Sequence, residues 1–371
     1  MSPIEIDTAL LAGLFFAATF VQLIYWLGIF PKTARHVPPA PPPVAPAPVS
    51  IIICARNEAE NLRANLPYFL NQDYPDFEVI VVNDASSDNS LEILLEFKRK
   101  NPNLRIAYLT TKVSRGKKAA LSKGIKAAKN NILLLSDADC RPASSKWLEH
   151  MQAFIRDPVE IGLGYSPYIR EKGILNAYVR FETVYSAIQY ISFAFVGMPY
   201  MGVGRNLIYR KHLFHEAGGF DDHMDVTSGD DDLFINAVAT PANTRVILSP
   251  EAFVFSRAKS SWRGYYRQKS RHLSTSTRYR PVHQLLLGAL SASHFGHYVL
   301  GLALILFHNL ETIVFINYLV RIVVVTAMYG LITRKLRDPS LVFWVPVFDA
   351  LYILYYLIFA PALFKKKEPW T

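Results

Sequence analysis

Long runs of apolar residues lie near both ends of the chain, and shorter runs alternate with polar, helix-like stretches between them. Residues 10–30 carry no charge, and about 20 apolar residues are enough for a helix to cross a bilayer. Later apolar runs cover residues 284–307, 312–332 and 341–364. The pattern predicts a membrane helix before the central region and a group of membrane helices after it.

The central region, from residue 50 to about residue 254, has a different pattern. Short runs rich in Ile, Val and Leu alternate with helix-like stretches, which predicts an α/β domain with a mostly parallel sheet. Asp88 or Asn89 can cap the helix expected to begin at residue 90. The expected strands are 50–54, 78–83, 105–110 and 131–136, and the expected helices are 58–70, 90–100 and 117–128.

Two other segments interrupt these patterns. Residues 37–49 are dense in proline, which excludes helix and sheet and favours an extended spacer. Residues 173–198 are rich in aromatic and small residues but contain Arg180 and Glu182. For this segment we expect one or two helices that lie in the membrane interface or line a membrane-facing cleft.

The first apolar segment is interpreted as a membrane anchor. A cleavable signal peptide needs a positive stretch before its apolar core, whereas residues 1–10 carry only acidic charges. Lys32 and Arg35 follow the segment, and this positive flank favours entry of the chain into the cytoplasm.

The membrane topology contains a parity problem. If all later apolar segments span, the C-terminus lies outside, yet the lysines at 365–367 favour the inside. We expect one segment to be re-entrant or interfacial, with residues 341–364 as the candidate because Pro346 and Asp349 interrupt it. Asp349, and Arg321 in the preceding segment, are expected to face protein or a cavity, not lipid.

Composition adds little to this picture. The net charge is +10, but many lysines and arginines flank apolar segments, where they face anionic headgroups. No basic helix or recognised nucleic-acid motif is present, so we do not expect nucleic acid as a partner. Cys54 and Cys140 are too few for a disulfide framework or a zinc site, and we expect them to be reduced, small buried residues.

Polar residues gather where the expected strands end. Arg56 and Glu58 follow the first strand, Asp84 ends the second, and Asp137 and Asp139 follow the fourth. Each cluster alone fits a turn or a helix cap. Ligands of open parallel sheets bind beyond the carboxyl ends of the strands, so the clusters together predict a binding site at that edge.

The pair Asp137 and Asp139 gives the sharpest signal. Side chains two residues apart in an extended chain point to the same side, and the apolar residues 132–135 place the pair at the end of a buried strand. Two buried carboxylates without a cation would repel each other. Hard oxygen ligands suit Mg²⁺ or Mn²⁺, so we expect a divalent metal held against a diphosphate; exposed turn acids are the alternative.

Further candidates lie later in the chain. Lys117 follows a glycine at the start of an expected helix, which fits phosphate binding or a solvated turn. Asp230 and Asp231 precede an apolar helix, either as a cap or as a carboxylate that takes the proton of an attacking hydroxyl. Gln268 and Arg271 share a helix face and could hold an acceptor or a phosphate, although juxtamembrane charge explains most basic residues there.

In this order and spacing, the motifs resemble those of the family-2 glycosyltransferases, whose GT-A fold is Rossmann-like. The resemblance is to the membrane-integrated group with cellulose, hyaluronan and poly-N-acetylglucosamine synthases and ceramide glucosyltransferase, and it covers about residues 50–272. It implies that Arg56, Glu58 and Asp84 contact the nucleoside, with Lys117 near the nucleotide.

The resemblance also implies roles in the reaction. Asp139, with Asp137 nearby, would bind the metal and diphosphate, and Asp231 would be the general base with Asp230 beside it. In this family a single displacement inverts the anomeric centre. The metal would stabilise the departing diphosphate.

The last motif departs from the family pattern. Gln268 and Arg271 would close over the diphosphate, but the family motif continues with Trp where this chain has His272. In polymerising members that Trp is associated with the acceptor sugar. The departure weakens the case for a processive polymer synthase and favours addition of one sugar to a lipid or short glycan.

We therefore expect an inverting glycosyltransferase that moves a sugar from a nucleotide sugar, expected to be a UDP-sugar, to a lipid or glycan acceptor. It would be an integral membrane protein of a bacterial plasma membrane, in contact with membrane lipids, with a cytoplasmic catalytic domain. The expected segments are an N-terminal anchor (1–31), a linker (32–49), a GT-A domain (50–255, with interfacial helices at 173–199), a juxtamembrane segment (256–282) and a C-terminal membrane region (283–371).

Other classes of function stay open. A processive polysaccharide synthase subunit is the nearest alternative. A non-catalytic nucleotide-sugar-binding membrane subunit would keep the fold and lose the base, but Asp231 and the metal pair are present. A membrane scaffold or transporter would leave the carboxylates at the sheet edge without a purpose.

Overall fold

The computed structural model describes residues 7–40, 42, 45–111 and 116–364, with side chains up to residue 361. The lysines at 365–367 and part of the proline-rich linker therefore lie outside the described residues. Contacts divide the chain into two compact units, one of residues 1–36 with 280–361 and one of residues 37–279 with 362–371.

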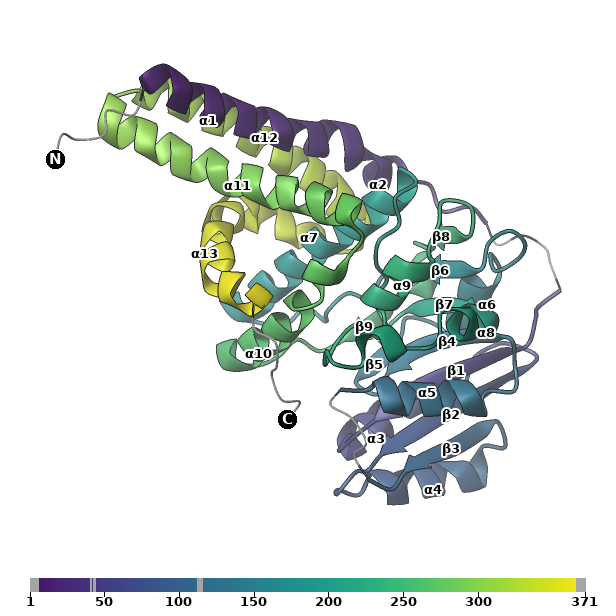
Figure 1. The fold of residues 1–371 in the computed structure, drawn as a ribbon. Coiled ribbons are helices and arrows are strands. Elements are labelled where there is room, and N and C mark those ends of the chain that lie inside the picture. The colour runs from purple at the N-terminus through teal and green to yellow at the C-terminus, as the bar shows by residue number, and fades with distance from the viewer. Residues whose placement is uncertain (1–6, 41, 43–44, 112–115, 365–371) are drawn as a thin grey trace. The chain divides into compact units, whose positions relative to one another are not determined.

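A mixed sheet forms the centre of the larger unit (Figure 1). Among the described residues it has seven strands in the order β3-β2-β1-β4-β7-β6-β8. The first four in the chain pair in parallel: β1 (Val49–Ala55), β2 (Phe77–Asp84), β3 (Leu104–Leu109) and β4 (Ile132–Asp137). β7 (Leu207–Arg210) is antiparallel to β4 and β6 (Ile161–Leu163), and β8 (Thr244–Val246) is parallel to β6. The predicted mostly parallel α/β fold is confirmed.

Helices cover both faces of this sheet because its strands are apolar on both sides. Ile51 and Ile53 pack in one core with side chains of α3 (Ala59–Leu70), α4 (Ser90–Lys100) and α6 (Trp147–Gln152). On the other face lies α5 (Lys118–Ala127), seen in front of the strands in Figure 1. Gly124 allows its close approach, since an added Cβ would lie 2.6 Å from the Ile52 side chain.

The second half of the larger unit contains short elements around one long helix. The segment 173–198 forms the single helix α7 (Ile174–Phe195), in which Arg180 and Glu182 are buried; its interfacial position stays a prediction. The remaining elements are a two-stranded sheet of β5 (Cys140–Pro142) and β9 (Val254–Ser256), the helices α8 (Lys211–Glu216), α9 (Asp232–Val238) and α10 (Trp262–Leu273), and the 3₁₀ turns η2 (Asp221–His223), η3 (Pro250–Ala252) and η4 (Ser276–Arg278).

The smaller unit is built from apolar helices. Among the described residues, four are long and apolar enough to cross a membrane, at Thr8–Arg35, Pro281–His308, Glu311–Lys335 and Pro339–Pro361. They comprise α1 (Thr8–Leu23) with η1 (Ile24–Ile29) and α2 (Pro31–Arg35), α11 (Pro281–His308), α12 (Glu311–Lys335), and η5 (Pro339–Trp344) with α13 (Val345–Phe364).

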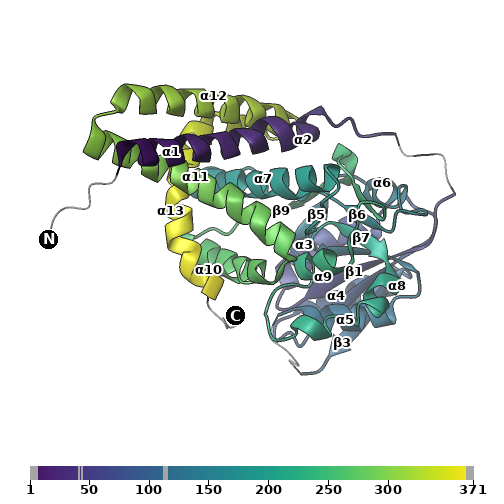
Figure 2. The ribbon, with the colours of Figure 1, turned by 45° about the horizontal axis from the view of Figure 1, so that its top comes forward.

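The last of these helices is arranged differently from the others. α1 packs along α11, and α12 packs against both. α13 crosses them at a steep angle in both Figure 1 and Figure 2. α13 belongs to the segment that was the candidate for a re-entrant or interfacial course, and that course stays a prediction.

A buried ion pair connects the apolar helices from inside. Arg321 Nη1 of α12 donates to Asp349 Oδ2 of α13 at 2.5 Å, and Nη2 donates to Asp349 Oδ1 at 3.2 Å. Nη2 also donates to Gln22 Oε1 of α1 at 2.9 Å, and the Tyr298 hydroxyl of α11 donates to Asp349 Oδ2 at 2.6 Å. As expected, the charges that interrupt two apolar segments face protein.

We expect Asp349→Leu to destabilise the smaller unit by about 3–5 kcal/mol, because it leaves the Arg321 guanidinium buried without its counter-ion. The measurement is thermal unfolding of the purified chain in detergent. The double variant Arg321→Leu with Asp349→Leu buries no charge and should unfold much closer to the wild type. A double variant as unstable as Asp349→Leu would contradict this explanation.

Candidate active site

Hydrogen bonds tie the loops after β1 and β2 to each other. Asn57 N donates to Ser86 Oγ at 3.0 Å, and Ser87 N donates to Asn57 Oδ1 at 2.8 Å. Asn57 has a positive φ of 55°, which asparagine tolerates better than most residues. These bonds hold the loop of Arg56 and Glu58 beside the end of β2, where Asp84 is buried.

Asp88 fixes two helices near the same edge. Its Oδ1 accepts a hydrogen bond from Ser90 N at 3.0 Å at the start of α4. Of the two predicted capping residues Asp88 therefore makes the bond, whereas Asn89, at the N-cap position, makes no side-chain capping bond. The Oδ2 of Asp88 accepts from Ala59 N at 3.1 Å at the start of α3. The two helices that follow the loops are thereby anchored by one carboxylate.

The predicted metal pair lies where β4 ends. Carboxylate oxygens of Asp137 and Asp139 and the Cys140 Sγ all lie within 4.8 Å of one another. Burial raises the pKa of Asp139, and the charge of Asp137 adds to the increase. Burial also acts to raise the pKa of Asp137, but the charge and hydrogen bond of Lys117, together with the charges of Arg205 and Arg271, hold the pKa below its usual value.

These residues fit a hard divalent cation. Two carboxylates converge, and the raised pKa of Asp139 means that nearby cations of the protein do not fully offset its burial and the charge of Asp137. Burial likewise raises the pKa of Glu58, and the charges of Asp139 and Asp137 contribute. A cation would relieve this repulsion. The Cys140 thiol is a soft group that Mg²⁺ and Mn²⁺ do not favour.

Lys117 joins the pair to a second acidic segment. Its Nζ lies 3.0 Å from Asp137 Oδ1 and 3.1 Å from Asp230 Oδ2. The preceding Gly116 has φ of 86°, and a Cβ there would lie 2.2 Å from the Thr227 carbonyl oxygen. Glycine therefore lets this loop pack against the segment that carries Asp230. Proximity of Lys117 to a nucleotide stays a prediction.

Asp231 is oriented by two backbone donors. Gly204 N donates to Asp231 Oδ2 at 2.7 Å, and Asp232 N donates to Oδ1 at 2.8 Å. Gly204 leaves room for this arrangement, because a Cβ there would lie 3.1 Å from Asp231 Oδ2 and 3.2 Å from Lys117 Nζ. The candidate base and the lysine thus lie beside the same glycine.

The environment of Asp231 suits proton transfer near neutral pH. Burial raises its pKa to about 7, and the charges of Asp230 and Asp232 contribute while Lys117 opposes them. A general base is most effective when its pKa lies near the working pH.

We expect kcat/KM for transfer to rise with pH through an inflection near 7. Asp231 accepts a proton only when deprotonated, so activity should fall about tenfold per pH unit below the inflection and level off above it. The measurement is a pH profile of kcat/KM, which reports the free enzyme. A flat profile between about pH 5.5 and 8 would exclude Asp231 as a base with this pKa.

The adjacent Asp232 has a different task. Its Oδ2 accepts hydrogen bonds from Thr275 Oγ1 and from the Tyr279 hydroxyl, the latter at 2.7 Å. Both partners follow α10. Asp232 therefore fastens the segment after α10 to the start of α9.

α10 brings the predicted Gln268 and Arg271 to the edge of the site. Arg271 is close enough for Asp230, Asp137 and Asp231 to act on its charge. Gln268 Nε2 donates to the Tyr168 hydroxyl at 3.3 Å. His272, which stands where the family pattern has Trp, is exposed.

The Cys54 thiol, near the end of β1, lies close to charged side chains from several parts of the site. Burial raises its pKa to about 12, and the charges of Lys117, Asp137, Asp230 and Asp84 also act on it. The strand ends therefore bring Asp84 and Asp137 to the segment of Asp230 and Asp231. The raised pKa keeps the thiol protonated, in line with the expected inert cysteine.

Two residues of this edge were not predicted. The Arg205 guanidinium lies 4.5 Å above the ring of Tyr168, and charges of Arg205 act on both Asp137 and Asp139. The signal available in the sequence was an isolated arginine directly after Gly202 and Gly204, before a short apolar strand.

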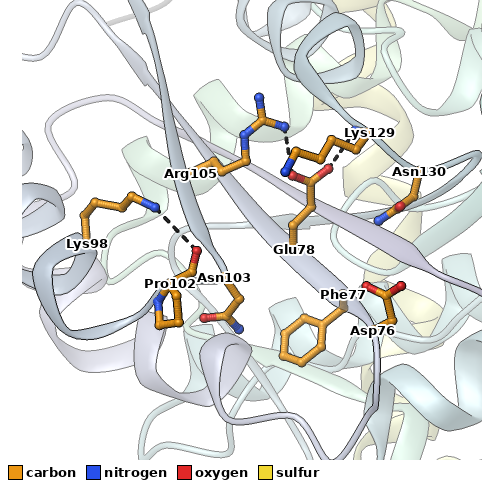
Figure 3. Close-up of a pocket in the computed structure, with 9 residues that line it drawn as sticks. All are labelled: Asp76, Phe77, Glu78, Lys98, Pro102, Asn103, Arg105, Lys129 and Asn130. Carbon is orange, nitrogen blue, oxygen red and sulfur yellow. Dashed lines mark hydrogen bonds and ion pairs between the residues drawn. The ribbon is translucent and has the colours of Figure 1, made fainter.

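A surface depression of about 400 Å³ lies at the opposite edge of the sheet (Figure 3). Glu78, near the start of β2, accepts hydrogen bonds there from Arg105 Nη1 at 2.8 Å and Lys129 N at 2.7 Å. These groups satisfy one another, and they lie at the amino ends of the strands. The depression is therefore separate from the acidic edge.

A mostly parallel sheet with acidic residues at the carboxyl ends of its strands defines a domain of the GT-A class. Residues 50–215 match the glycosyl transferase family 2. This part of the chain belongs to that family, so the chain carries a family-2 glycosyltransferase domain.

Curated relatives agree with this assignment. The chain is 28% identical over 189 residues to the poly-β-1,6-N-acetyl-D-glucosamine synthase of Staphylococcus epidermidis, across 47% of this chain and 42% of the relative. It is 26% identical over 235 residues to the probable glycosyltransferase YdaM of Bacillus subtilis, across 60% of this chain and 54% of the relative. The chain matches about half the length of these relatives.

A solved structure shows the same fold over nearly the whole chain. The mannosyltransferase PcManGT from Pyrobaculum calidifontis, in complex with GDP-Man and Mn²⁺, superposes with a TM-score of 0.61 and 19% sequence identity. The match covers 94% of this chain and 99% of the other. The predicted GT-A fold is confirmed.

Proposed function

We propose that this chain is an inverting glycosyltransferase that transfers a sugar from a nucleotide sugar to an acceptor at the membrane surface, with the help of a divalent cation. The position of Lys117 carries the proposal. Its ammonium contacts both Asp137 of the metal pair and Asp230 beside the candidate base. The groups that we propose for activating donor and acceptor are therefore linked through one ammonium.

Asp139 and Asp137 would hold the cation. When bound, a divalent cation supplies charge that stabilises the departing diphosphate. Mn²⁺ in the complex of the Pyrobaculum calidifontis enzyme supports a divalent metal. Arg271 of α10 would add positive charge on the diphosphate, with Gln268 one helical turn before it.

Asp231 would take the proton of the attacking hydroxyl. The hydrogen bonds from Gly204 N and Asp232 N fix its carboxylate, and its pKa of about 7 suits the task. Attack of the acceptor oxygen on the anomeric carbon, with departure of the nucleoside diphosphate, inverts that carbon in a single displacement.

Arg56, Glu58 and Asp84 would bind the nucleoside from the tied loops after β1 and β2. A UDP-sugar is our expected donor. The Staphylococcus epidermidis relative is named for a polymer of N-acetylglucosamine, which favours UDP-N-acetylglucosamine as the first donor to test.

The acceptor is proposed to be a lipid-linked or short glycan that receives one sugar. The exposed His272 in place of the family Trp supports this choice. Similarity to the polymer synthase supports a second candidate, processive polysaccharide synthesis. With a radiolabelled donor, a discrete lipid-soluble product supports single addition, and high-mass material supports the polymer.

Membrane lipids are proposed to surround the apolar helices of the smaller unit. Their length and composition fit spans, and the positive flank of the first one supports a cytoplasmic catalytic domain. A bacterial plasma membrane is the proposed location.

The test is a screen of nucleotide sugars with the purified full chain in detergent. UDP-N-acetylglucosamine, UDP-glucose and GDP-mannose are each added with and without MnCl₂. We expect one donor to raise the unfolding temperature and to be hydrolysed or transferred only with the cation. Absence of binding and turnover for every donor would contradict the proposed function.

A further inference from the structure

Arg205 lies near the metal pair, since its charge acts on Asp137 and Asp139, and its neighbour in the chain contacts the candidate base. It directly follows Gly204, whose N–H donates to Asp231 Oδ2 at 2.7 Å. Its Nη2 donates to the Ser166 carbonyl oxygen at 3.3 Å, and its guanidinium lies 4.5 Å from the centre of the Tyr168 ring. One face and one nitrogen of the guanidinium are therefore occupied by protein.

The ring below Arg205 is itself fixed. Gln268 Nε2 donates to the Tyr168 hydroxyl at 3.3 Å. Gln268 of α10 therefore holds the Tyr168 ring on which the Arg205 guanidinium lies. Such cation–π contacts favour a guanidinium that keeps its charge.

A second guanidinium nitrogen, Nη1, has no such contact. Nη1 of Arg205 is buried and has no hydrogen-bond partner among the described residues. Buried polar groups are nearly always hydrogen-bonded, and a charged group without a partner is costly. The nearby carboxylates are occupied otherwise: Asp137 contacts Lys117 and Asp139 contacts the Cys140 thiol.

The charges around Arg205 identify the kind of ligand. Arg205 acts on Asp137 and Asp139, which would hold the cation. An arginine beside metal-binding carboxylates suits a ligand that carries several negative oxygens and also binds the metal. Guanidinium groups bind phosphate oxygens with charge-assisted hydrogen bonds.

We propose that Arg205 binds the diphosphate of the donor through Nη1 and stabilises the charge that develops on it as the sugar departs. This inference rests on the proposed function. It adds a diphosphate-binding residue to Arg271, from a different element. Preorganised cations at the leaving group act most strongly where charge increases in the transition state.

The test compares Arg205→Gln and Arg205→Lys with a control, Arg257→Gln. The control removes the same charge from a side chain that is 79% exposed. Calorimetry measures three binding reactions: UDP with Mn²⁺, uridine, and Mn²⁺ alone. If the wild type prefers guanine, GDP replaces UDP and guanosine replaces uridine. We expect Arg205→Gln to weaken UDP binding about 10- to 100-fold and Arg205→Lys to weaken it less.

Mn²⁺ alone should bind Arg205→Gln as well as or better than the wild type, because the substitution removes a cation beside Asp139. Uridine binding should not change. A purely structural role would weaken Mn²⁺ and UDP together and would overturn the proposal. Unchanged UDP affinity, with or without a raised KM for the acceptor, would also overturn it. If the wild type binds neither nucleotide, the proposed function itself fails.

Discussion

Asp231→Asn is expected to reduce sugar transfer by a factor of about 10²–10⁴ while donor binding stays nearly unchanged. The amide keeps the size of the side chain and can still accept one of the two backbone hydrogen bonds, from Gly204 N. It cannot take a proton from the acceptor hydroxyl. The measurement pairs initial transfer rates with calorimetric binding of the donor and Mn²⁺.

Asp232→Asn is the matched comparison. It changes the neighbouring carboxylate, whose Oδ2 accepts hydrogen bonds from Thr275 and Tyr279 and is thereby occupied. Its amide oxygen can still accept those hydrogen bonds, so transfer should fall far less. Near-wild-type transfer in Asp231→Asn, or equal losses in both variants, would remove Asp231 from the role of base.

Asp139→Asn is expected to lower transfer by about 10²–10³ and to abolish the dependence of donor binding on Mn²⁺. The substitution removes one charged oxygen ligand from the proposed metal site. EDTA should stop the wild-type reaction, and added Mn²⁺ should restore it in the wild type but not in the variant. A Mn²⁺ titration of donor binding measures the effect.

Stability separates this effect from misfolding. The pKa of Asp139 is raised, so the folded state disfavours its charged form at neutral pH. Without metal, Asp139→Asn should therefore unfold at the same temperature as the wild type or higher. Asp157→Asn, at a side chain that is 89% exposed, controls for loss of a carboxylate. Full metal-dependent activity in Asp139→Asn would exclude it as a ligand.

The first half of the fold could be predicted from the sequence because its signals are local. The helix expected at residues 90–100 is α4 (Ser90–Lys100), and the expected strands lie within one or two residues of β1 to β4. Apolar runs of strand length, and capping residues such as Asp88, can be recognised from short stretches of consecutive residues. The second half offered less, because β6 and β8 are short and have no repeating pattern.

Several contacts of the site could not be predicted, because they depend on how distant segments fold together. Lys117 was recognised as a candidate cation, but nothing near it in the sequence points to Asp230. Asp231 and Asp232 are adjacent, and only the direction of α9 decides which one faces the site. Arg205 was missed because an isolated arginine after glycines has no motif of its own.

The apolar helices illustrate the same limit. Arg321 and Asp349 were expected to face protein because a charge in lipid is costly. The sequence did not predict that they pair with each other and also contact Gln22 and Tyr298, because these contacts depend on the packing of separate helices.

The ammonium shared by Asp137 and Asp230 has a thermodynamic consequence. Suppose that a ligand binds Asp137 and takes this carboxylate away from Lys117. The charge of Lys117 is then less neutralised, so it attracts the carboxylate of Asp231 more strongly and lowers the pKa of that group. Such linkage is reciprocal, so deprotonation of Asp231 favours binding of the ligand at Asp137. If Asp231 is the base, arrival of the donor would thereby prepare the group that activates the acceptor.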